Sequence, residues 1–221
     1  MNNSKFYTTI KPYFLEFLSA IMAGICISIG CVAYLSAQNH VIGSLFFTVG
    51  LFLVLIFDFS LFTGRIGFAL DKKPKYIINL ILIWLGNFCG ALLSGFALSA
   101  TRLNSLQEKC VQMCQTKLTD SLFSLFVLGI FCNILIFVAV YGFKKNDKPL
   151  IKFLSLIFGV SVFVLCGFEH CVADMFYFAF ARIFSGQQIL ALFIITLGNI
   201  TGGLFMGLII KLKDYLKNQK K

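Results

Sequence analysis

The chain has 221 residues, of which 59% are hydrophobic and only 13% are charged. Soluble globular domains are nearer half apolar and a quarter charged, and a soluble domain of this length could not bury so much apolar surface. The composition therefore excludes an ordinary soluble domain and favours a membrane protein with several spans. The net charge of +10 does not indicate nucleic-acid binding, because the positive residues cluster between the apolar runs.

Six apolar segments follow one another along the chain, and crossing a bilayer takes about 20 residues. They cover approximately residues 13–36, 42–70, 76–99, 121–143, 150–183 and 187–211. The connections are short except for the polar loop 101–120. The sequence predicts an all-α polytopic membrane protein, built as a single transmembrane domain over residues 1–221.

Positive residues are distributed unequally between the two sides of these segments. Fourteen of the 19 Lys and Arg residues lie on the side that holds both termini, the 2–3 loop and the 4–5 loop. Because cytoplasmic loops are enriched in Lys and Arg, we expect both termini in the cytoplasm, which requires an even number of spans. The fourteen are Lys5, Lys11, Lys72, Lys73, Lys75, Lys144, Lys145, Lys148, Lys152, Lys211, Lys213, Lys217, Lys220 and Lys221.

The second and fifth segments are too long for one uniform helix, and each is interrupted. The second breaks at "DFSLFTGRIG", residues 58–67, and the fifth breaks at "VLCGFEHCVADMF", residues 164–176. Non-helical backbone at membrane depth is tolerated only where it lines a cavity or is buried in protein. We therefore expect broken helices 2 and 5 to border a functional site.

The sequence also contains an internal repeat. "LGNFCGALLSG", residues 85–95, matches "LGNITGGLFMG", residues 197–207, at a constant offset of 112 positions. Each copy follows an interrupted segment, so we predict two three-span halves, about 10–100 and 118–213, of opposite topology. Inverted repeats with broken helices at corresponding positions place a transport site between the breaks. The repeated glycines themselves indicate close helix packing.

Two polar residues of the breaks are candidates for chemistry. His170 is one of two histidines and lies inside an apolar segment. It is interpreted as a proton-exchanging or anion-binding group, because ionisable residues within a membrane are costly and histidine changes charge near neutral pH. The alternative is a buried imidazole with satisfied hydrogen bonds. Thr63 in the other break offers a hydroxyl that can bind an anion without a permanent charge.

The remaining polar residues of the spans suit supporting roles. We expect the Glu169 side chain to hydrogen-bond backbone at the break, and Asp174 to share the face of His170 if a helix has resumed there. Asn87, Asn133 and Asn199 suit hydrogen bonds between helices. Lys117 precedes the fourth segment, where it is either an ordinary loop lysine or a group that attracts anions. Cys110 and Cys114 in the polar loop are compatible with pairing, metal binding or free thiols.

Several of these stretches resemble the formate/nitrite transporter family of bacterial anion channels. "GFEHCVADMF" in the fifth segment resembles the family's "GFEHSxANMF" signature, and "SLFTG" matches its "(D/E)LFT(S/G)" break in the second segment. "AIMAGICISIG", "GIFCNILIFVAVY" and "TLGN" in segments 1, 4 and 6 also fit. The resemblance covers nearly the whole chain in order, and the histidine signature is its specific part.

The resemblance implies an aquaporin-like fold of six helices, a homopentamer with one pore per protomer, and passage of formate, nitrite or hydrosulfide. It identifies His170 as the central pore histidine, Thr63 as its partner, and Lys117 and Asn133 as further pore residues. It assigns no enzymatic activity, cofactor or metal. It places the protein in the bacterial inner membrane. The apolar constrictions fall at Phe47, Leu51, Leu61, Phe62 and Phe163.

Three residues depart from the family pattern. The serine after the histidine is Cys171 here, and the asparagine that follows is Asp174, which puts an acid near the pore histidine. The acid expected before Leu-Phe-Thr is Ser60.

The mechanism we expect is proton-coupled passage of a weak-acid anion. Desolvation prevents a bare anion from crossing an apolar slit, so His170 would share or donate a proton there. One alternative is a neutral-solute channel of aquaporin type, although none of the three prolines falls in a break. Another is a metal or redox protein using Glu169, His170, Cys171 and Cys166, whose adjacency gives poor tetrahedral geometry. A third is a packing subunit, which would leave the two matched breaks unexplained.

Overall fold

The computed structural model describes residues 3–219, and within that range every regular element is helical. Lys220 and Lys221 lie outside the described residues. In chain order the elements are α1 (Asn3–Ser36), α2 (His40–Ile56), α3 (Phe62–Ile66), η1 (Ala69–Asp71), α4 (Tyr76–Ser99), η2 (Arg102–Leu106), α5 (Gln107–Thr119), α6 (Leu122–Lys145), α7 (Pro149–Leu165), α8 (Cys171–Phe180) and α9 (Gly186–Asn218).

The apolar segments of the sequence correspond to these helices. Four of them, α1, α4, α6 and α9, are long and apolar enough to cross a membrane, counting only the described residues. The second predicted segment is divided into α2 and α3, and the fifth into α7 and α8. Side chains of Asn39, Ser121 and Ser185 accept backbone N–H groups at the starts of α2, α6 and α9, which is why these helices begin where they do.

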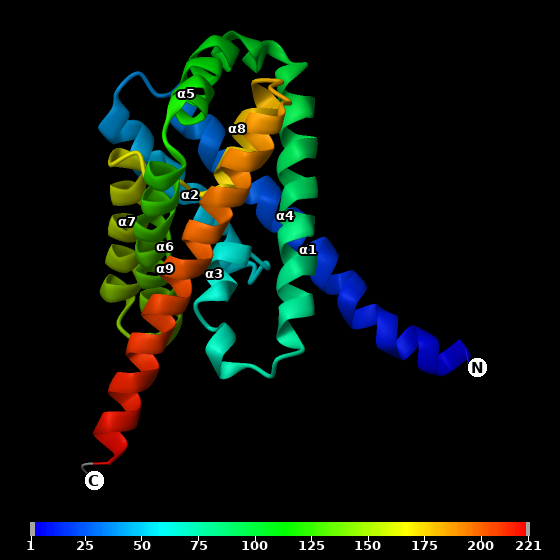
Figure 1. Cartoon of the computed structure of the whole chain (residues 1–221), viewed down its shortest axis with the longest axis vertical. Helices are drawn as coiled ribbons and strands as arrows, with labels where there is room; N and C mark the ends of the chain where they lie inside the picture. Colours follow the sequence, from blue (N-terminus) through cyan, green and yellow to red (C-terminus); the bar gives the residue numbers. More distant parts are fainter. Residues whose placement is uncertain (1–2, 220–221) are drawn as a thin grey trace.

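The helices pack as two similar groups (Figure 1). In the first group α1 packs against α4 and α2, and in the second α6 packs against α9 and α7. The groups meet where α2 packs against α7 and where α8 packs against α4. Large apolar side chains cover the outside, an arrangement that suits lipid rather than water. The most exposed include Ile77, Leu93, Phe123, Leu150 and Ile189.

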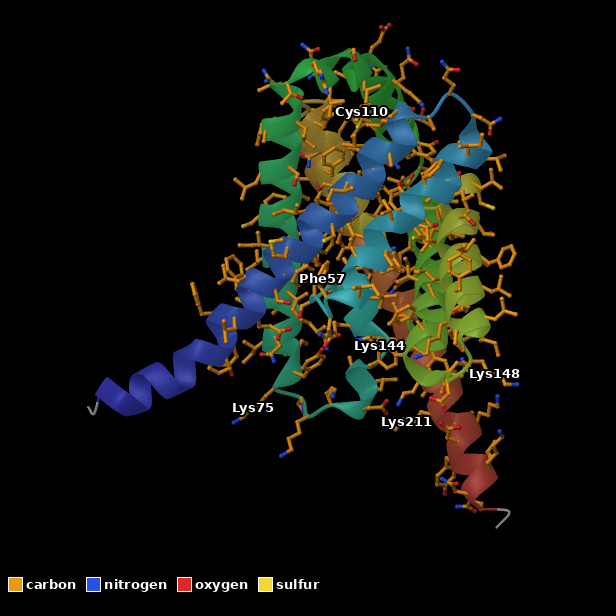
Figure 2. All side chains as sticks on the ribbon, turned by 180° about the vertical axis from the view of Figure 1, so that it is seen from behind. Phe57, Lys75, Cys110, Lys144, Lys148 and Lys211 are labelled. Atoms are coloured by element: carbon orange, nitrogen blue, oxygen red, sulfur yellow. The ribbon has the colours of Figure 1, made fainter. Side chains whose placement is uncertain are left out.

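The two ends of the bundle differ in charge and in structure. The start of α1 and the end of α9 project from the same end, while α5 lies across the opposite end (Figure 1). The labelled lysines Lys75, Lys144, Lys148 and Lys211 all lie toward the end with the termini (Figure 2). We call this the lysine end, and the end that carries α5 the α5 end.

The connection between α4 and α6 is more ordered than we predicted. We expected a polar loop over 101–120, but the chain there forms η2 and α5. Cys110 and Cys114 are four residues apart, so the helix places both on one face, and both are fully buried as free thiols. The Cys110 thiol donates to the backbone oxygen of Tyr177 at 3.3 Å. This contact ties α5 to α8.

Glycines allow the closest approach between helices. A Cβ atom on Gly90 of α4 would overlap the backbone of Ile21 in α1, with the Ile21 carbonyl carbon at 3.0 Å. Gly202 of α9 has the same relation to Ile130 of α6, again with the carbonyl carbon at 3.0 Å. The repeated glycines therefore serve the packing role that the sequence indicated.

Replacing Gly90 by Ala should destabilise the protein by about 1–3 kcal/mol, because α4 must move away from the backbone of α1. Gly186→Ala is the matched control, since a Cβ there meets no atom within 4 Å. The measurement is thermal unfolding of purified protein in detergent. Equal unfolding temperatures for the two variants would contradict the packing role of Gly90.

Candidate functional site

Two stretches of non-helical backbone lie between α2 and α3 and between α7 and α8. They comprise residues 57–61 and 166–170. In each stretch the second residue has a left-handed backbone conformation: Asp58 with φ 49° in the first and Gly167 with φ 68° in the second. Few residues other than glycine adopt this conformation, although aspartate tolerates it. Leu61 and His170 then hold the extended N-cap positions of α3 and α8.

A buried hydrogen bond joins the two stretches. The Thr63 Oγ1 atom of α3 lies 2.8 Å from Nε2 of His170, and both residues are at most 2% exposed. His170 Nδ1 accepts the backbone N–H of Ala173 at 3.2 Å. Because Nδ1 is an acceptor, the imidazole is neutral with its hydrogen on Nε2, which donates to Thr63. The hydroxyl hydrogen of Thr63 is then available to another acceptor.

Aromatic and aliphatic side chains surround this pair on the α2 and α7 side. The Phe163 ring stacks on His170 with ring centroids 5.7 Å apart, and Phe47 meets Phe163 edge-on at 5.6 Å. Leu51 and Leu61 are both 1% exposed. Four of the five predicted constriction residues are thus buried in this core. Two of them, Phe47 and Phe163, form a row of aromatic contacts that ends at His170.

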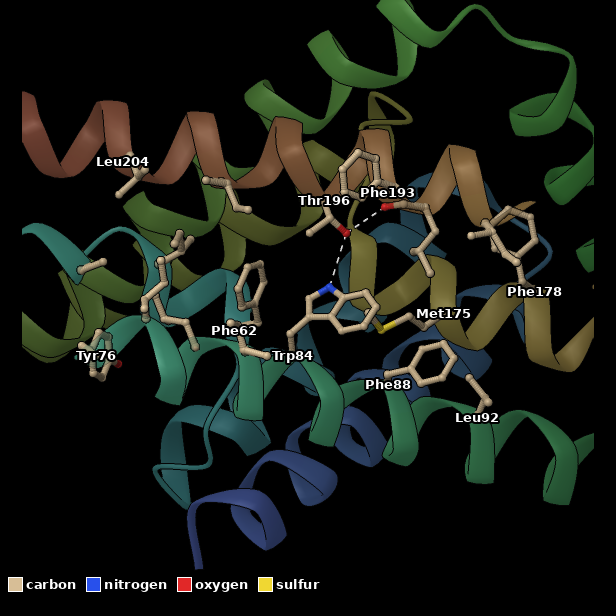
Figure 3. Close-up of a pocket in the computed structure, with 18 of the residues that line it drawn as sticks. Phe62, Tyr76, Trp84, Phe88, Leu92, Met175, Phe178, Phe193, Thr196 and Leu204 are labelled. Atoms are coloured by element: carbon tan, nitrogen blue, oxygen red, sulfur yellow. Dashed lines mark hydrogen bonds between the residues drawn. The ribbon is translucent and has the colours of Figure 1, made fainter. Parts of the chain in front are cut away.

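The fifth constriction residue, Phe62, lines a different space. It belongs to an apolar groove of about 1230 Å³ between α4, α8 and α9. The labelled side chains of Trp84, Phe88 and Met175 point into this groove, and the Trp84 indole N–H donates to Thr196 at 3.4 Å (Figure 3). Neither His170 nor Thr63 lines it, so the groove is separate from the histidine–threonine pair.

Asn87 of α4 holds the first break in place. Its Oδ1 accepts the Phe62 N–H at 2.8 Å, and its Nδ2 donates to the Ser60 carbonyl at 2.9 Å. The same Nδ2 donates to the Ala20 carbonyl of α1 at 2.8 Å. One buried amide therefore satisfies two backbone groups that the break leaves without partners, and it ties them to α1.

Asn199 of α9 repeats this arrangement at the second break. Its Oδ1 accepts the Cys171 N–H at 2.9 Å, and its Nδ2 donates to the carbonyls of Glu169 and Gly129 at 2.8 Å each. The two asparagines are the pair that the sequence repeat aligned. The predicted role of Asn199 in hydrogen bonding between helices is therefore specifically that of a brace for the break.

Asn133 of α6 contacts the backbone of Asn199 from the neighbouring helix. Its Nδ2 donates to the Asn199 carbonyl at 2.6 Å, as expected for an amide that links helices. Its Oδ1 is buried and has no hydrogen-bond partner among the described residues. The residue supports α9, and the pore role that the family resemblance implies for it stays a prediction.

Lys117 reaches from α5 toward α8 and forms two ion pairs. Its Nζ contacts Oε2 of Glu169 and lies 3.0 Å from Oδ1 of Asp174. The Lys117 side chain is 12% exposed, and those of Glu169 and Asp174 are 6% and 1% exposed. Burial alone would lower the pKa of Lys117, but the carboxylates of Asp174 and Glu169 together raise it above its ordinary value. Lys117 is therefore a charged, paired lysine rather than an ordinary loop lysine.

The structure changes one of our expectations at this cluster and extends another. We expected the Glu169 side chain to hydrogen-bond backbone at the break, but it pairs with Lys117, and Asn199 braces the backbone instead. We expected Asp174 to share the face of His170 if a helix resumed there. Helix α8 does begin at Cys171, and the Oδ1 atom of Asp174 is directed to Lys117. The sequence could not reveal this triad, because Lys117 lies more than 50 positions from its partners.

An acid that sequence reasoning missed lies near Ser60. The Ser60 hydroxyl donates to Oε1 of Glu16 in α1 at 2.7 Å, and the Ser60 N–H donates to Ser19 at 3.0 Å. Arg65 contributes a further contact to the Ser60 hydroxyl at 3.4 Å. Glu16 thus supplies a carboxylate where the family pattern has one before Leu-Phe-Thr. The missing acid at position 60 was the signal that could have prompted a search for it.

Within residues 3–219, no group of three or more His, Cys, Asp or Glu side chains is arranged to hold a metal ion. Cys171 is buried, whereas Cys166 is exposed.

Comparison with known proteins identifies the family. The family model described as "Formate/nitrite transporter" matches residues 5–212. This chain belongs to the formate/nitrite transporter family. Among curated relatives, it is 33% identical over 198 residues to "Formate channel FocA" of Haemophilus influenzae, covering 79% of this chain and 69% of that protein. It is 30% identical over 185 residues to "Formate channel FocB" of Escherichia coli, covering 75% and 66% respectively.

Two solved structures of the formate/nitrite transporter family share the fold. "Pentameric formate channel with formate bound" superposes with a TM-score of 0.80 at 28% identity, covering 95% of this chain and 98% of that one. "FNT family ion channel" also has a TM-score of 0.80, at 24% identity, covering 94% and 92%. The relatives are channels and transporters, and this family member is not an enzyme.

Proposed function

We propose that this chain forms a channel for small monovalent anions, formate first among them, with one pore in each protomer of a homopentamer. The observation that carries the proposal is the buried pair of Thr63 and His170, which meet at 2.8 Å from opposite breaks. Relatives described as formate channels and a pentameric structure with formate bound support it. Nitrite and hydrosulfide carry the same single charge and belong to the proposal.

The proposed architecture is six spans arranged as an inverted 3+3 repeat, aquaporin-like, over residues 1–221. Spans 2 and 5 are the interrupted ones, formed by α2 with α3 and by α7 with α8. The matched braces of Asn87 and Asn199 support the repeat, because each binds the same two kinds of backbone group at its own break. The repeat halves are those of the sequence, about 10–100 and 118–213.

The proposed location is the bacterial inner membrane, with the lysine end in the cytoplasm. The lysines gathered near both termini support this orientation (Figure 2), since cytoplasmic loops retain positive charge. The α5 end would then face outward, and Lys117 would lie on the outer side of His170.

The proposed route passes Lys117 and Asn133, then Thr63 and His170. The Thr63 hydroxyl hydrogen offers the anion a hydrogen bond where the apolar side chains of Leu51, Leu61 and Phe163 exclude water. A bare anion pays a large desolvation penalty there. Proton coupling through His170 would lower that penalty by letting a nearly neutral acid pass.

The test is uptake of formate into liposomes that contain the purified protein. Uptake should rise with an inward proton gradient, and His170→Asn should weaken this dependence because asparagine cannot carry a proton. Thr201→Val is the control, since that exposed hydroxyl bonds only to its own helix. Unchanged uptake and pH dependence in His170→Asn would overturn the role of His170. A parallel panel of nitrite, hydrosulfide and lactate ranks the anions.

A further inference from the structure

The buried triad of Lys117, Glu169 and Asp174 has one negative charge in excess. Both carboxylates contact the same Nζ atom, so their oxygens lie within about 6 Å of each other, a range in which like charges oppose each other's ionisation. Lys117 can neutralise only one of them. With all three groups ionised, the triad would carry a net charge of −1 in a place that is almost entirely closed to solvent.

Among the described residues, no other charged group balances this excess at Asp174. Its ionisable neighbours are the thiols of Cys31, Cys114, Cys132 and Cys171, together with the neutral imidazole of His170. The helices α1, α3, α4 and α9 also pack against α8. Of these, α4 has no Asp, Glu, Lys, Arg or His, and α9 has none before Lys211. The charged side chains described on α1 and α3 are Glu16 and Arg65, and both contact Ser60 at the first break. The excess charge thus remains unless a proton joins the triad.

An orphaned oxygen marks where that proton would be held. Oδ1 of Asp174 receives Lys117, but Oδ2 is buried and has no hydrogen-bond partner among the described residues. A buried carboxylate oxygen without a donor is costly, whereas a protonated carboxyl group removes the charge that needed one. The geometry therefore favours a carboxylic acid over a carboxylate at this position.

We propose that the pair of Glu169 and Asp174 retains one proton, held on Oδ2 of Asp174, and that this proton makes Asp174 a selectivity-determining residue for anion passage. With the proton bound, the triad is neutral and an anion approaching from the α5 end meets no repulsion. When the proton leaves, the triad carries −1 and repels the anion. Anion flux therefore falls as pH rises, independently of any proton gradient. This inference rests on the proposed anion transport for its effect, though not for the proton itself.

The first experiment detects the proton without any transport. Infrared difference spectra of the purified protein, titrated between about pH 5 and about pH 8 as in the flux experiment below, report the C=O stretch of a protonated carboxyl group. The wild-type protein should lose such a band as pH rises. Asp174→Asn and Glu169→Gln should both lack it at every pH, because in each variant Lys117 and the remaining carboxylate form a neutral pair. A band that persists in either variant, or that is absent from the wild-type protein, overturns the proposal.

The second experiment measures formate flux into liposomes with equal pH on both sides, driven by a membrane potential. Between about pH 5 and about pH 8, the wild-type flux should fall at least about tenfold more than that of Asp174→Asn, as expected for one buried charge near the path. Glu108→Gln is the control, since it removes an exposed acid from the same helix α5. Its profile should match the wild type.

The two experiments separate the two proposals. Flux with identical pH profiles in wild type and Asp174→Asn would overturn the selectivity role and leave anion transport standing. A titrating band without flux of any tested anion would overturn the proposed transport, and with it the selectivity role, while the retained proton would stand.

Discussion

Replacing Lys117 by Met should destabilise the protein by about 3–5 kcal/mol, because the substitution leaves buried carboxyl groups without their cation. Glu169 and Asp174 are at most 6% exposed in their side chains, so water cannot replace the lysine. The loss should be smaller at acidic pH, where both carboxyl groups can bind protons and become neutral. Thermal unfolding in detergent at several pH values measures both effects.

A control variant and a double variant test whether the loss of stability comes from the triad. Lys145→Met removes an exposed lysine and should leave the unfolding temperature nearly unchanged. Adding Asp174→Asn to Lys117→Met should recover part of the loss, because one of the two acids is then gone. Equal unfolding temperatures for Lys117→Met and Lys145→Met would show that the triad contributes nothing to stability.

Replacing Asn199 by Leu should cost about 3 kcal/mol or more, because two buried backbone groups at the break lose their partner at once. Leucine is close to asparagine in shape but has no polar atoms, so Cys171 N–H and the Glu169 carbonyl at the break would be orphaned, and the Gly129 carbonyl of α6 would lose its second donor. The break should then become mobile, and His170 should lose its fixed distance to Thr63. Loss of formate flux should accompany the loss of stability.

Asn87→Leu provides an internal comparison for this prediction. It orphans the Phe62 N–H and the Ser60 carbonyl and removes the second donor to the Ala20 carbonyl of α1, so its cost should match that of Asn199→Leu. Thr201→Val on α9 is the neutral control. Unfolding temperatures that differ widely between the two leucine variants would contradict the equivalence of the two braces.

The span pattern could be predicted from the sequence because lipid imposes it. Apolar runs of sufficient length and lysines between them led to the helices that the structure contains, including α4 at its predicted bounds of 76–99. The interruptions were predictable because ionisable residues rarely stand inside such runs and because the second and fifth runs are too long for one uniform helix. The repeated Leu-Gly-Asn then indicated that the two asparagines have equivalent positions.

The side-chain contacts between residues far apart in the sequence could not be predicted in the same way. Helical periodicity says which residues share a face, but it does not say which face meets which. Lys117 and Asp174 are brought together by α5, which the polar composition of residues 101–120 did not indicate as a helix. Glu16 meets Ser60 across 44 positions. Asp174 was recognised as a departure from the family pattern, yet only its ion pair with Lys117 explains how a buried acid is accommodated.

The hydrogen bond from Ala173 to His170 limits what the histidine can do. Nε2 already carries a hydrogen, so an incoming proton can bind only to Nδ1, and that nitrogen caps the first turn of α8. Charging the imidazole therefore removes a helix cap, a loss of about 0.5–2 kcal/mol. In the proposed channel, the site at rest would offer an anion hydrogen bonds rather than a proton. Under the proposed proton coupling, a complete proton transfer would require the start of α8 to rearrange first, so the free energy of that rearrangement would add to the cost of each transport event.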